Sequence, residues 1–210
     1  PPAGPIQNTI DELAARGVRI HFGRWLVTGR PLALLIDPAS VAHRLAQVKY
    51  SLWKDNGIGS PAGDHEFDEI VLFGAAVAEF FTVLQQRLAG RPLLAHFHEW
   101  QGAAALPMLR HRRVPLATVF TTHATTVGRN LSAANVNLYE HLGSIDAGAV
   151  AYTHGYGHRH ALEGAAAQAA DVFTTVSGIT ALEARQFLAR PPDCLLPNGL
   201  NIERFAAPPE

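Results

Sequence analysis

Short apolar runs rich in β-branched residues alternate with longer amphipathic segments along most of this chain. The runs have the length of buried strands, and the segments between them carry apolar residues at helical spacing. We expect strands at residues 18–22, 32–36, 93–97, 114–120, 172–176 and 195–196. Strands that alternate with helices form a parallel sheet with helices on both of its faces. The sequence therefore predicts one α/β domain built on a Rossmann-like, doubly wound parallel sheet.

The segments between the strands predict the helices. Residues 64–88 carry acidic residues in their first turns, where the helix dipole favours negative charge, and are apolar nearly all round beyond them, so we expect a buried helix. A first helix is expected to end near Ala15 with Asn8 or Thr9 as its cap. Further helices are expected at residues 41–53, 99–110, 159–169 and 178–188, and residues 143–157 are expected to be a loop. The wholly apolar run 32–36 is typical of a strand covered on both faces.

Charge and composition exclude several classes of function. The chain has 17 Lys+Arg, 18 Asp+Glu and a net charge of -1, which provides no basic field for a nucleic-acid backbone. The most apolar run, residues 70–84, is too short for a bilayer and contains Glu79, and no signal peptide is visible. We therefore expect a soluble protein with no nucleic-acid or membrane partner. Its single cysteine, Cys194, excludes an internal disulfide framework and is expected to be buried.

Polar residues that could form a site follow the expected strand at 93–97. In parallel sheets ligands bind at the carboxyl ends of the strands, which singles out these positions. His96 and His98 are two residues apart on an extended segment and so point the same way. A zinc site needs at least a third ligand, and no other histidine stands at a signature spacing, so we expect no metal. Glu99 follows directly, and Trp100 is either part of the site or a core aromatic.

Two more candidate segments follow later strands. Thr121, Thr122 and His123 could donate hydrogen bonds to a hydroxylated ligand, and Arg129 could pair with a phosphate; a helix cap and a surface salt bridge are equally good interpretations. Asn198, in Pro197-Asn198-Gly199, could reach into a cleft or belong to an ordinary turn. No Walker loop, Gly-x-Gly-x-x-Gly fingerprint or Gly-x-Ser-x-Gly elbow occurs in the sequence.

Read together, these motifs closely resemble glycogen synthases of the fungal and animal type, glycosyltransferase family 3. Residues 95–100, 119–125, 128–129, 171–177, 179–181 and 196–201 carry the resemblance, and residues 22–26, 52–53 and 71–74 fit the family as well. The order and spacing match from about Ile10 to Phe205, which a shared fold alone would not produce.

The resemblance implies a GT-B enzyme, in which two Rossmann-like domains face each other across a cleft. Residues 1–210 would form a single, incomplete N-terminal, acceptor-side domain. The first strand with its Lys-Thr-Gly-Gly loop and the C-terminal nucleotide-binding domain would lie outside this chain. Both ends of the chain are rich in proline and are interpreted as cuts or linkers.

The implied reaction is retaining transfer of glucose from UDP-glucose to the non-reducing end of an α-1,4-glucan such as glycogen. No cofactor or metal is needed if cationic side chains of the other domain hold the diphosphate. The full-length protein is expected to be a homo-oligomer, and the isolated fragment to be inactive. Alternatives are a related enzyme with another donor, such as ADP-glucose, or another acceptor, and a non-catalytic glucan-binding domain.

The resemblance also assigns roles to individual residues. His123 matches the histidine that contacts the donor glucose and is the candidate catalytic residue, and Arg129 matches an arginine of the donor site. Asn198 matches an asparagine near the glucose ring. Glu99 and Trp100 occupy the loop that lies beside the sugar and acceptor in related glucan synthases.

Overall fold

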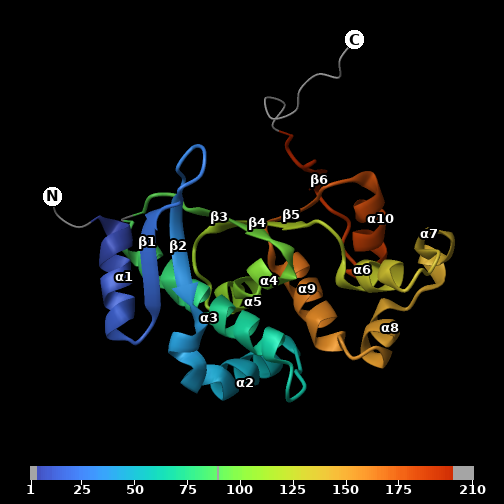
Figure 1. Cartoon of the computed structure of the whole chain (residues 1–210), viewed down its shortest axis with the longest axis horizontal. Coiled ribbons are helices and arrows are strands. Elements are labelled where there is room, and N and C mark those ends of the chain that lie inside the picture. The colour runs from blue at the N-terminus through green and yellow to red at the C-terminus, as the bar shows by residue number, and fades with distance from the viewer. Residues whose placement is uncertain (1–3, 89, 201–210) are drawn as a thin grey trace, which may run out of the picture.

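The computed structural model describes residues 4–88 and 90–200 of the chain. Its centre is a parallel sheet of order β3-β4-β5-β6, formed by β3 (Leu94–His98), β4 (Ala117–Thr122), β5 (Val172–Thr175) and β6 (Cys194–Leu195). Helices α3, α4, α5 and α9 lie beneath this sheet, and α6, α7, α8 and α10 lie beyond its β5–β6 side (Figure 1). The predicted α/β fold with a parallel sheet is confirmed.

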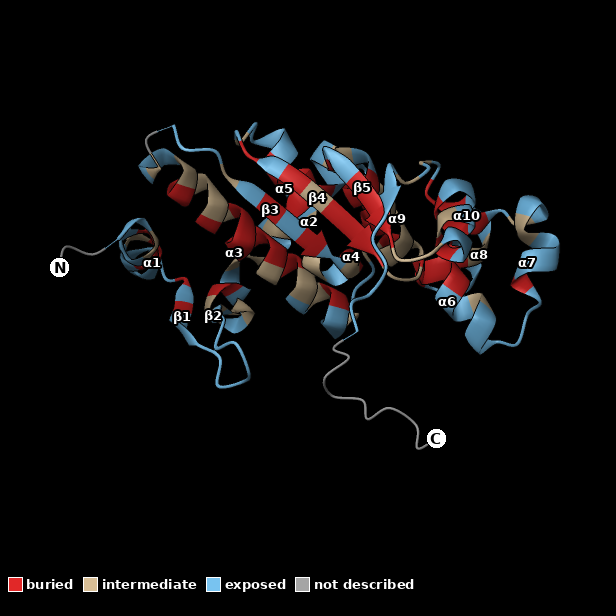
Figure 2. Ribbon diagram, turned by 90° about the horizontal axis from the view of Figure 1, so that it is seen from above, coloured by how far each residue is buried: buried red, intermediate tan, exposed pale blue. Residues whose placement is uncertain are grey.

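The first two strands do not join that sheet. β1 (Arg19–Arg24) and β2 (Leu32–Asp37) form a separate antiparallel hairpin, which lies beside α1 and apart from β3 (Figure 2). The expectation that residues 32–36 are covered on both faces is therefore wrong, because Leu32 and Leu35 are 58% and 53% exposed. An antiparallel pair needs only one face against a core, and an apolar run alone does not distinguish the two cases.

The first helices form at the N-terminal end of the chain. α1 (Pro5–Ala15) begins at a proline, whose missing N–H is not needed in a first turn. The cap predicted at Asn8 or Thr9 is wrong, since Thr9 lies inside the helix, buried, and its hydroxyl donates to the carbonyl of Pro5. A 3-10 helix, η1 (Pro38–Arg44), leads into α2 (Leu45–Asn56), which ends at Gly57 in the left-handed conformation that glycine favours.

The long helix α3 (His65–Arg87) is the centre of the core. The side chain of Asp64 accepts a hydrogen bond from the N–H of Phe67 and so caps its first turn. The helix packs against α1, η1, α2 and α5 and contributes to two apolar clusters. One cluster lies under the hairpin, and the other lies under the parallel sheet, where it includes Phe67, Leu106, Phe120 and Phe173. The predicted buried helix is confirmed.

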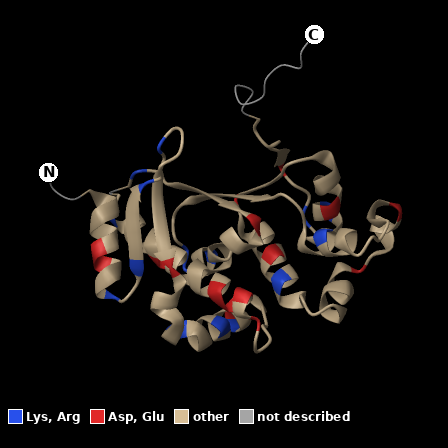
Figure 3. Cartoon of the chain, viewed as in Figure 1, with Lys and Arg blue, Asp and Glu red and all other residues tan. Residues whose placement is uncertain are grey.

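The remaining helices connect the strands of the parallel sheet. They are α4 (Glu99–Gly102), α5 (Ala105–His111), α6 (Thr126–Ala133), α7 (Leu138–His141), η2 (Leu142–Ser144), α8 (Ala147–Thr153), α9 (Gly157–Ala169) and α10 (Gly178–Phe187). Figure 3 shows acidic and basic positions mixed over the helices beneath the sheet. In the described residues, no helix is both long enough and apolar enough to cross a membrane.

Two further expectations are corrected by these elements. Residues 143–157 are not a loop, because α8 forms there with the Asp146 carboxylate accepting from the N–H of Ala149. Its buried alanines, Ala147 and Ala151, pack into the apolar cluster of Val127, Leu138, Tyr156 and Phe187, a tertiary contact that the local sequence does not reveal. Cys194 is exposed rather than buried, because β6 is a two-residue strand at the edge of the sheet.

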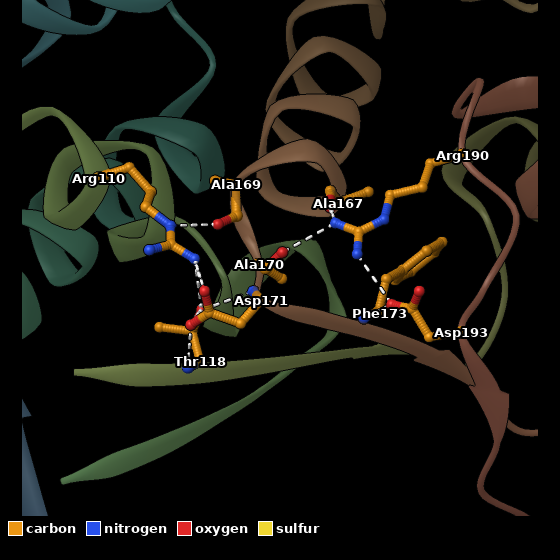
Figure 4. Close-up of polar contacts among 9 residues, drawn as sticks. All are labelled: Arg110, Thr118, Ala167, Ala169, Ala170, Asp171, Phe173, Arg190 and Asp193. Atoms are coloured by element: carbon orange, nitrogen blue, oxygen red, sulfur yellow. Dashed lines mark hydrogen bonds and ion pairs between the residues drawn. The ribbon is translucent and has the colours of Figure 1, made fainter. Parts of the chain in front are cut away.

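Charged side chains join the helices to the amino ends of β4 and β5 (Figure 4). The carboxylate of Asp171, directly before β5, accepts from the N–H and the hydroxyl of Thr118 at 2.7 and 2.9 Å. Arg110 of α5 pairs with Asp171 and donates to the carbonyl of Ala169. Partial burial opposes ionisation of Asp171, but the hydrogen bonds from Arg110 and Thr118 outweigh it and lower the pKa of this carboxyl. Arg190 makes similar contacts with Ala167, Ala170 and Asp193.

Asp171→Asn is expected to lower the free energy of unfolding by about 1–2 kcal/mol at pH 7, because charge-assisted hydrogen bonds at a partly exposed site are lost. The lowered pKa means that the ionised carboxylate stabilises the fold above its unfolded pKa and that this contribution disappears as the pH falls through its folded pKa. Urea unfolding of both proteins at several pH values should show the difference shrink below about pH 4. A constant difference over that range would contradict the assignment, and Asp11→Asn, on the exposed side of α1, is the control.

Candidate functional site

A cleft of about 680 Å³ opens beside the carboxyl ends of β3 and β4. Its walls come from the start of α3, from α4, from the β4–α6 turn and α6, and from the start of α9. It is lined by Glu66, Glu99, Trp100, Gln101, His123, Ala124, Thr126, Arg129, Asn130, Tyr156 and Arg159. Four of the five predicted site residues are in this group. A smaller groove of about 390 Å³ between α2, α3 and α5 contains none of them.

Glu99 connects two of the other predicted residues. One of its carboxylate oxygens, Oε1, accepts from the backbone N–H of His123 at 2.8 Å, and the other, Oε2, pairs with the guanidinium of Arg129 at 3.2 Å. Glu99 itself has a φ of 59°, in the left-handed region that non-glycine residues rarely adopt. Such outliers persist where surrounding structure enforces them, and they cluster at functional sites. Here the unusual backbone joins β3 directly to α4 while the carboxylate reaches the β4–α6 turn.

Three histidines lie together at the same end of the sheet. The rings of His96 and His98 are 4.2 Å apart, which confirms that both point the same way, and Nδ1 of His98 is 3.2 Å from Nε2 of His123. Nε2 of His96 is 2.7 Å from the hydroxyl of Thr121. Burial and the neighbouring imidazoles lower the pKa of His98, so this ring is neutral at pH 7. Within residues 4–88 and 90–200, no three metal-ligating side chains are arranged to hold a metal ion.

Trp100 belongs to both the core and the cleft. Its side chain is 7% exposed and stacks on Phe67, with ring centroids 6.3 Å apart. The guanidinium of Arg159 lies 5.5 Å from the Trp100 ring centroid, a cation–π contact at the edge of the cleft. Both interpretations of this residue from the sequence are therefore compatible with its position.

Arg159 is a cleft residue that the sequence did not reveal. It pairs with Glu66 at 2.6 Å and with the carboxylate of Asp64 at 2.8 Å. Burial opposes ionisation of Asp64, but hydrogen bonds from Arg159 and His158 lower its pKa to about 2. Asp64 was predicted only as part of a helix start, and no local pattern indicates that it faces α9 across 95 residues.

Two buried carboxylates lie behind the β4–α6 turn. Glu163 of α9 accepts from the Thr122 hydroxyl at 3.0 Å and from the N–H of Thr126 at 2.8 Å. Glu183 of α10 accepts from the hydroxyls of Thr125 and Tyr139 at 2.9 and 2.7 Å. The hydrogen bond to Glu183 and burial raise the pKa of Tyr139 to about 12. Both glutamates lie within helices that the sequence predicts, at residues 159–169 and 178–188, and no local pattern marks them as the buried residues that the structure shows.

Asn198 is not brought into this cleft. It lies three residues after β6, is exposed, and is not among the residues that line the cleft in the described part of the chain. Its position downstream of β6 does place it on the carboxyl side of the sheet, as predicted.

Comparison with known proteins decides the family. A family model described as glycogen synthase matches residues 1–210, the whole chain. The chain belongs to the glycogen synthase family. It is 41% identical over 202 residues to the liver glycogen [starch] synthase of Mus musculus and 44% identical over 204 residues to isoform 1 of Saccharomyces cerevisiae. It is 42% identical over 207 residues to the glycogen [starch] synthase of Neurospora crassa.

These matches cover 96%, 97% and 98% of this chain but 29% of the length of each relative. The predicted resemblance to glycogen synthases is confirmed, and its extent along the chain agrees with the motifs that carry it. The α/β fold with its four-stranded parallel sheet is consistent with a Rossmann-like half of a GT-B glycosyltransferase.

Proposed function

We propose that residues 1–210 form the greater part of the N-terminal, acceptor-side half of a retaining glucosyltransferase. The reaction is transfer of glucose from UDP-glucose to the non-reducing end of an α-1,4-glucan. One observation carries the proposal: in a chain of the glycogen synthase family, Glu99 joins His123 and Arg129 at one cleft on the carboxyl side of the sheet. This is the part of a parallel α/β fold where ligands bind.

The chemistry fits these side chains. Glucosyl transfer passes through an oxocarbenium-like state, so catalysis requires positioning and charge stabilisation. In this proposal the imidazole of His123 orients a hydroxyl of the donor glucose, and the guanidinium of Arg129 stabilises the phosphate side of the donor. The leaving diphosphate deprotonates the acceptor hydroxyl, so no protein nucleophile is required. Glu99 and Trp100 form the wall beside the sugar, and Asn198 contacts the glucose ring once donor is bound.

The test is incorporation of labelled glucose into glycogen by the full-length protein that carries this chain, with UDP-glucose and ADP-glucose compared. Incorporation from UDP-glucose supports the proposal, and incorporation from ADP-glucose alone contradicts the donor assignment. If neither donor is used by folded protein that still co-sediments with glycogen, the chain belongs to a glucan-binding module instead. The isolated 210-residue chain is expected to be inactive in the same assay.

Two properties of the full-length protein are part of the proposal and rest on family membership alone. It is expected to be a homo-oligomer and to work in the cytoplasm. Size-exclusion chromatography with light scattering tests the first, and fractionation of the source cells tests the second.

Glu99→Ala in the full-length protein is expected to lower kcat by about 10- to 100-fold, because the turn carrying His123 and the guanidinium of Arg129 both lose their partner. Steady-state kinetics with UDP-glucose measures the effect. Glu140→Ala is the control, since Glu140 is an exposed glutamate on α7 outside the cleft. Equal activities of the two variants would show that the Glu99 bridge does not matter for transfer.

A further inference from the structure

Glu163 occupies an unusual place for a carboxyl group. It is fully buried, with 0% of its surface exposed, on the face of α9 that packs against α6. Its two oxygens contact the two ends of one turn: Oε1 lies 3.0 Å from the Thr122 hydroxyl at the end of β4, and Oε2 lies 2.8 Å from the N–H of Thr126 at the start of α6. His123 is inside that turn. One buried side chain thus spans the segment that presents the candidate catalytic histidine to the cleft.

The Thr122 hydroxyl has a second acceptor. It lies 3.1 Å from the carbonyl oxygen of Ala124, the residue after His123. A hydroxyl has one proton and cannot donate to both the carboxyl group and the carbonyl. If Glu163 is ionised, Thr122 donates to it and the Ala124 carbonyl loses this donor. If Glu163 is a neutral acid, its O–H donates to Thr122, Thr122 donates to Ala124, and Oε2 still accepts from Thr126. Of the two states, the neutral acid gives both the Thr122 hydroxyl oxygen and the Ala124 carbonyl a donor from the protein.

The surroundings of Glu163 favour the same state. Burial is the largest influence on its pKa and outweighs the hydrogen bonds from Thr126 and Thr122, which lower it, so the pKa of Glu163 is raised to about 7. The Glu99 carboxylate on α4 contributes a smaller increase. The arginines on the other helices that pack against α9 pair elsewhere, Arg129 of α6 with Glu99 and Arg110 of α5 with Asp171. The ring of His111 on α5 faces Asp55. On α9 itself, Arg159 and His158 pair with Asp64.

We propose that Glu163 is a positioning residue that holds the His123 turn in its active arrangement as a neutral acid, through the chain Glu163–Thr122–Ala124 and the bond to Thr126. The role of the turn rests on the proposed glucosyl transfer. Glu163 does not touch substrate, since it is not among the residues that line the cleft. It acts by fixing the residues on both sides of His123.

Three variants of the full-length protein test whether Glu163 positions the turn and whether it does so as a neutral acid. Glu163→Gln supplies an N–H donor and a carbonyl acceptor in place of the O–H and C=O of the neutral acid, and is expected to keep kcat within about threefold of wild type at pH 7. Glu163→Ala removes both contacts and is expected to lower kcat by at least about tenfold, with KM for UDP-glucose changed less than about twofold. Asp171→Asn is the matched control, because Asp171 also accepts from a threonine hydroxyl and an N–H, but at the opposite end of the sheet. It is expected to leave kcat unchanged.

The pH profile supplies a readout that a purely structural role would not move. Above about pH 7 wild type ionises Glu163 and its kcat is expected to fall relative to that of Glu163→Gln. Loss of kcat in Glu163→Gln equal to that in Glu163→Ala would overturn the neutral-acid assignment. Unchanged kcat in Glu163→Ala would overturn the positioning role, and identical pH profiles for wild type and Glu163→Gln would overturn the dependence on ionisation.

Thermal denaturation tests the neutral acid without activity. The folded-state pKa of Glu163 lies above its unfolded value, so its contribution to stability is fully present below the unfolded pKa and is lost as the pH rises through the folded pKa. The Tm of wild type is therefore expected to fall relative to that of Glu163→Gln between about pH 5 and pH 8. If wild type transfers no glucose, the proposed function fails, and this comparison still decides whether Glu163 is neutral. A Tm difference independent of pH would overturn the neutral acid.

Discussion

Replacing His123 with alanine is expected to reduce glucosyl transfer by about 10²–10⁴-fold, the range over which loss of one polar catalytic side chain acts. The backbone of His123 is held by Glu99, and its side chain lines the cleft. Its Nε2 lies 3.2 Å from Nδ1 of His98, a ring whose pKa is lowered by burial and by neighbouring imidazoles. This environment keeps His98 neutral, and the His123 ring beside it can hydrogen-bond to a sugar hydroxyl.

Labelled-glucose incorporation by the full-length protein measures this effect. The fold should not change, because the His123 side chain is only partly buried and its backbone N–H keeps its partner. His21→Ala is a suitable control, since His21 is exposed on β1, outside the cleft. Activity of His123→Ala within a few-fold of wild type, with an unchanged circular dichroism spectrum, would remove His123 from the site.

Gly128→Ala is expected to lower the free energy of unfolding by about 3 kcal/mol, the upper range for overpacking a buried site. A Cβ at this position would lie 2.1 Å from Oε2 of Glu183 and 2.7 Å from Oγ1 of Thr125. Glu183 is 5% exposed and is held by the hydroxyls of Thr125 and Tyr139. The carboxylate cannot move away from a new methyl group without breaking those hydrogen bonds inside the core. The Thr125 hydroxyl, which caps the first turn of α6, would be displaced.

The matched control for this substitution is Gly164→Ala. Gly164 is also helical, but a Cβ there meets nothing within 4 Å. It is expected to stabilise the chain by about 0.5–1 kcal/mol, since alanine favours a helix more than glycine does. Urea unfolding of both variants measures the difference. Equal free energies of unfolding would show that the space around Gly128 is larger than the structure indicates.

The parallel sheet and the long helix were predictable because their signals are local. The strands at 93–97 and 172–176 are short runs rich in apolar and β-branched residues between helical segments, and α3 has a cap, an acidic first turn and a continuous apolar surface. The hairpin of β1 and β2 was assigned to the wrong sheet, because partner choice depends on contacts outside the run. Helix α8 was missed for a related reason: its alanines bury against residues from α6, α7 and α10.

Motif order and strand–helix alternation are local properties of the chain, so the family, the α/β class and the end of the sheet at which candidate site residues gather could be predicted from them. Which side chains meet depends on how the elements pack. Glu99 reaches His123 and Arg129 through a left-handed backbone at the end of β3, and Glu163 reaches Thr122 and Thr126 from a helix far along the chain. Such contacts depend on the register of neighbouring strands and on the packing of α9 against α6, which no local pattern encodes.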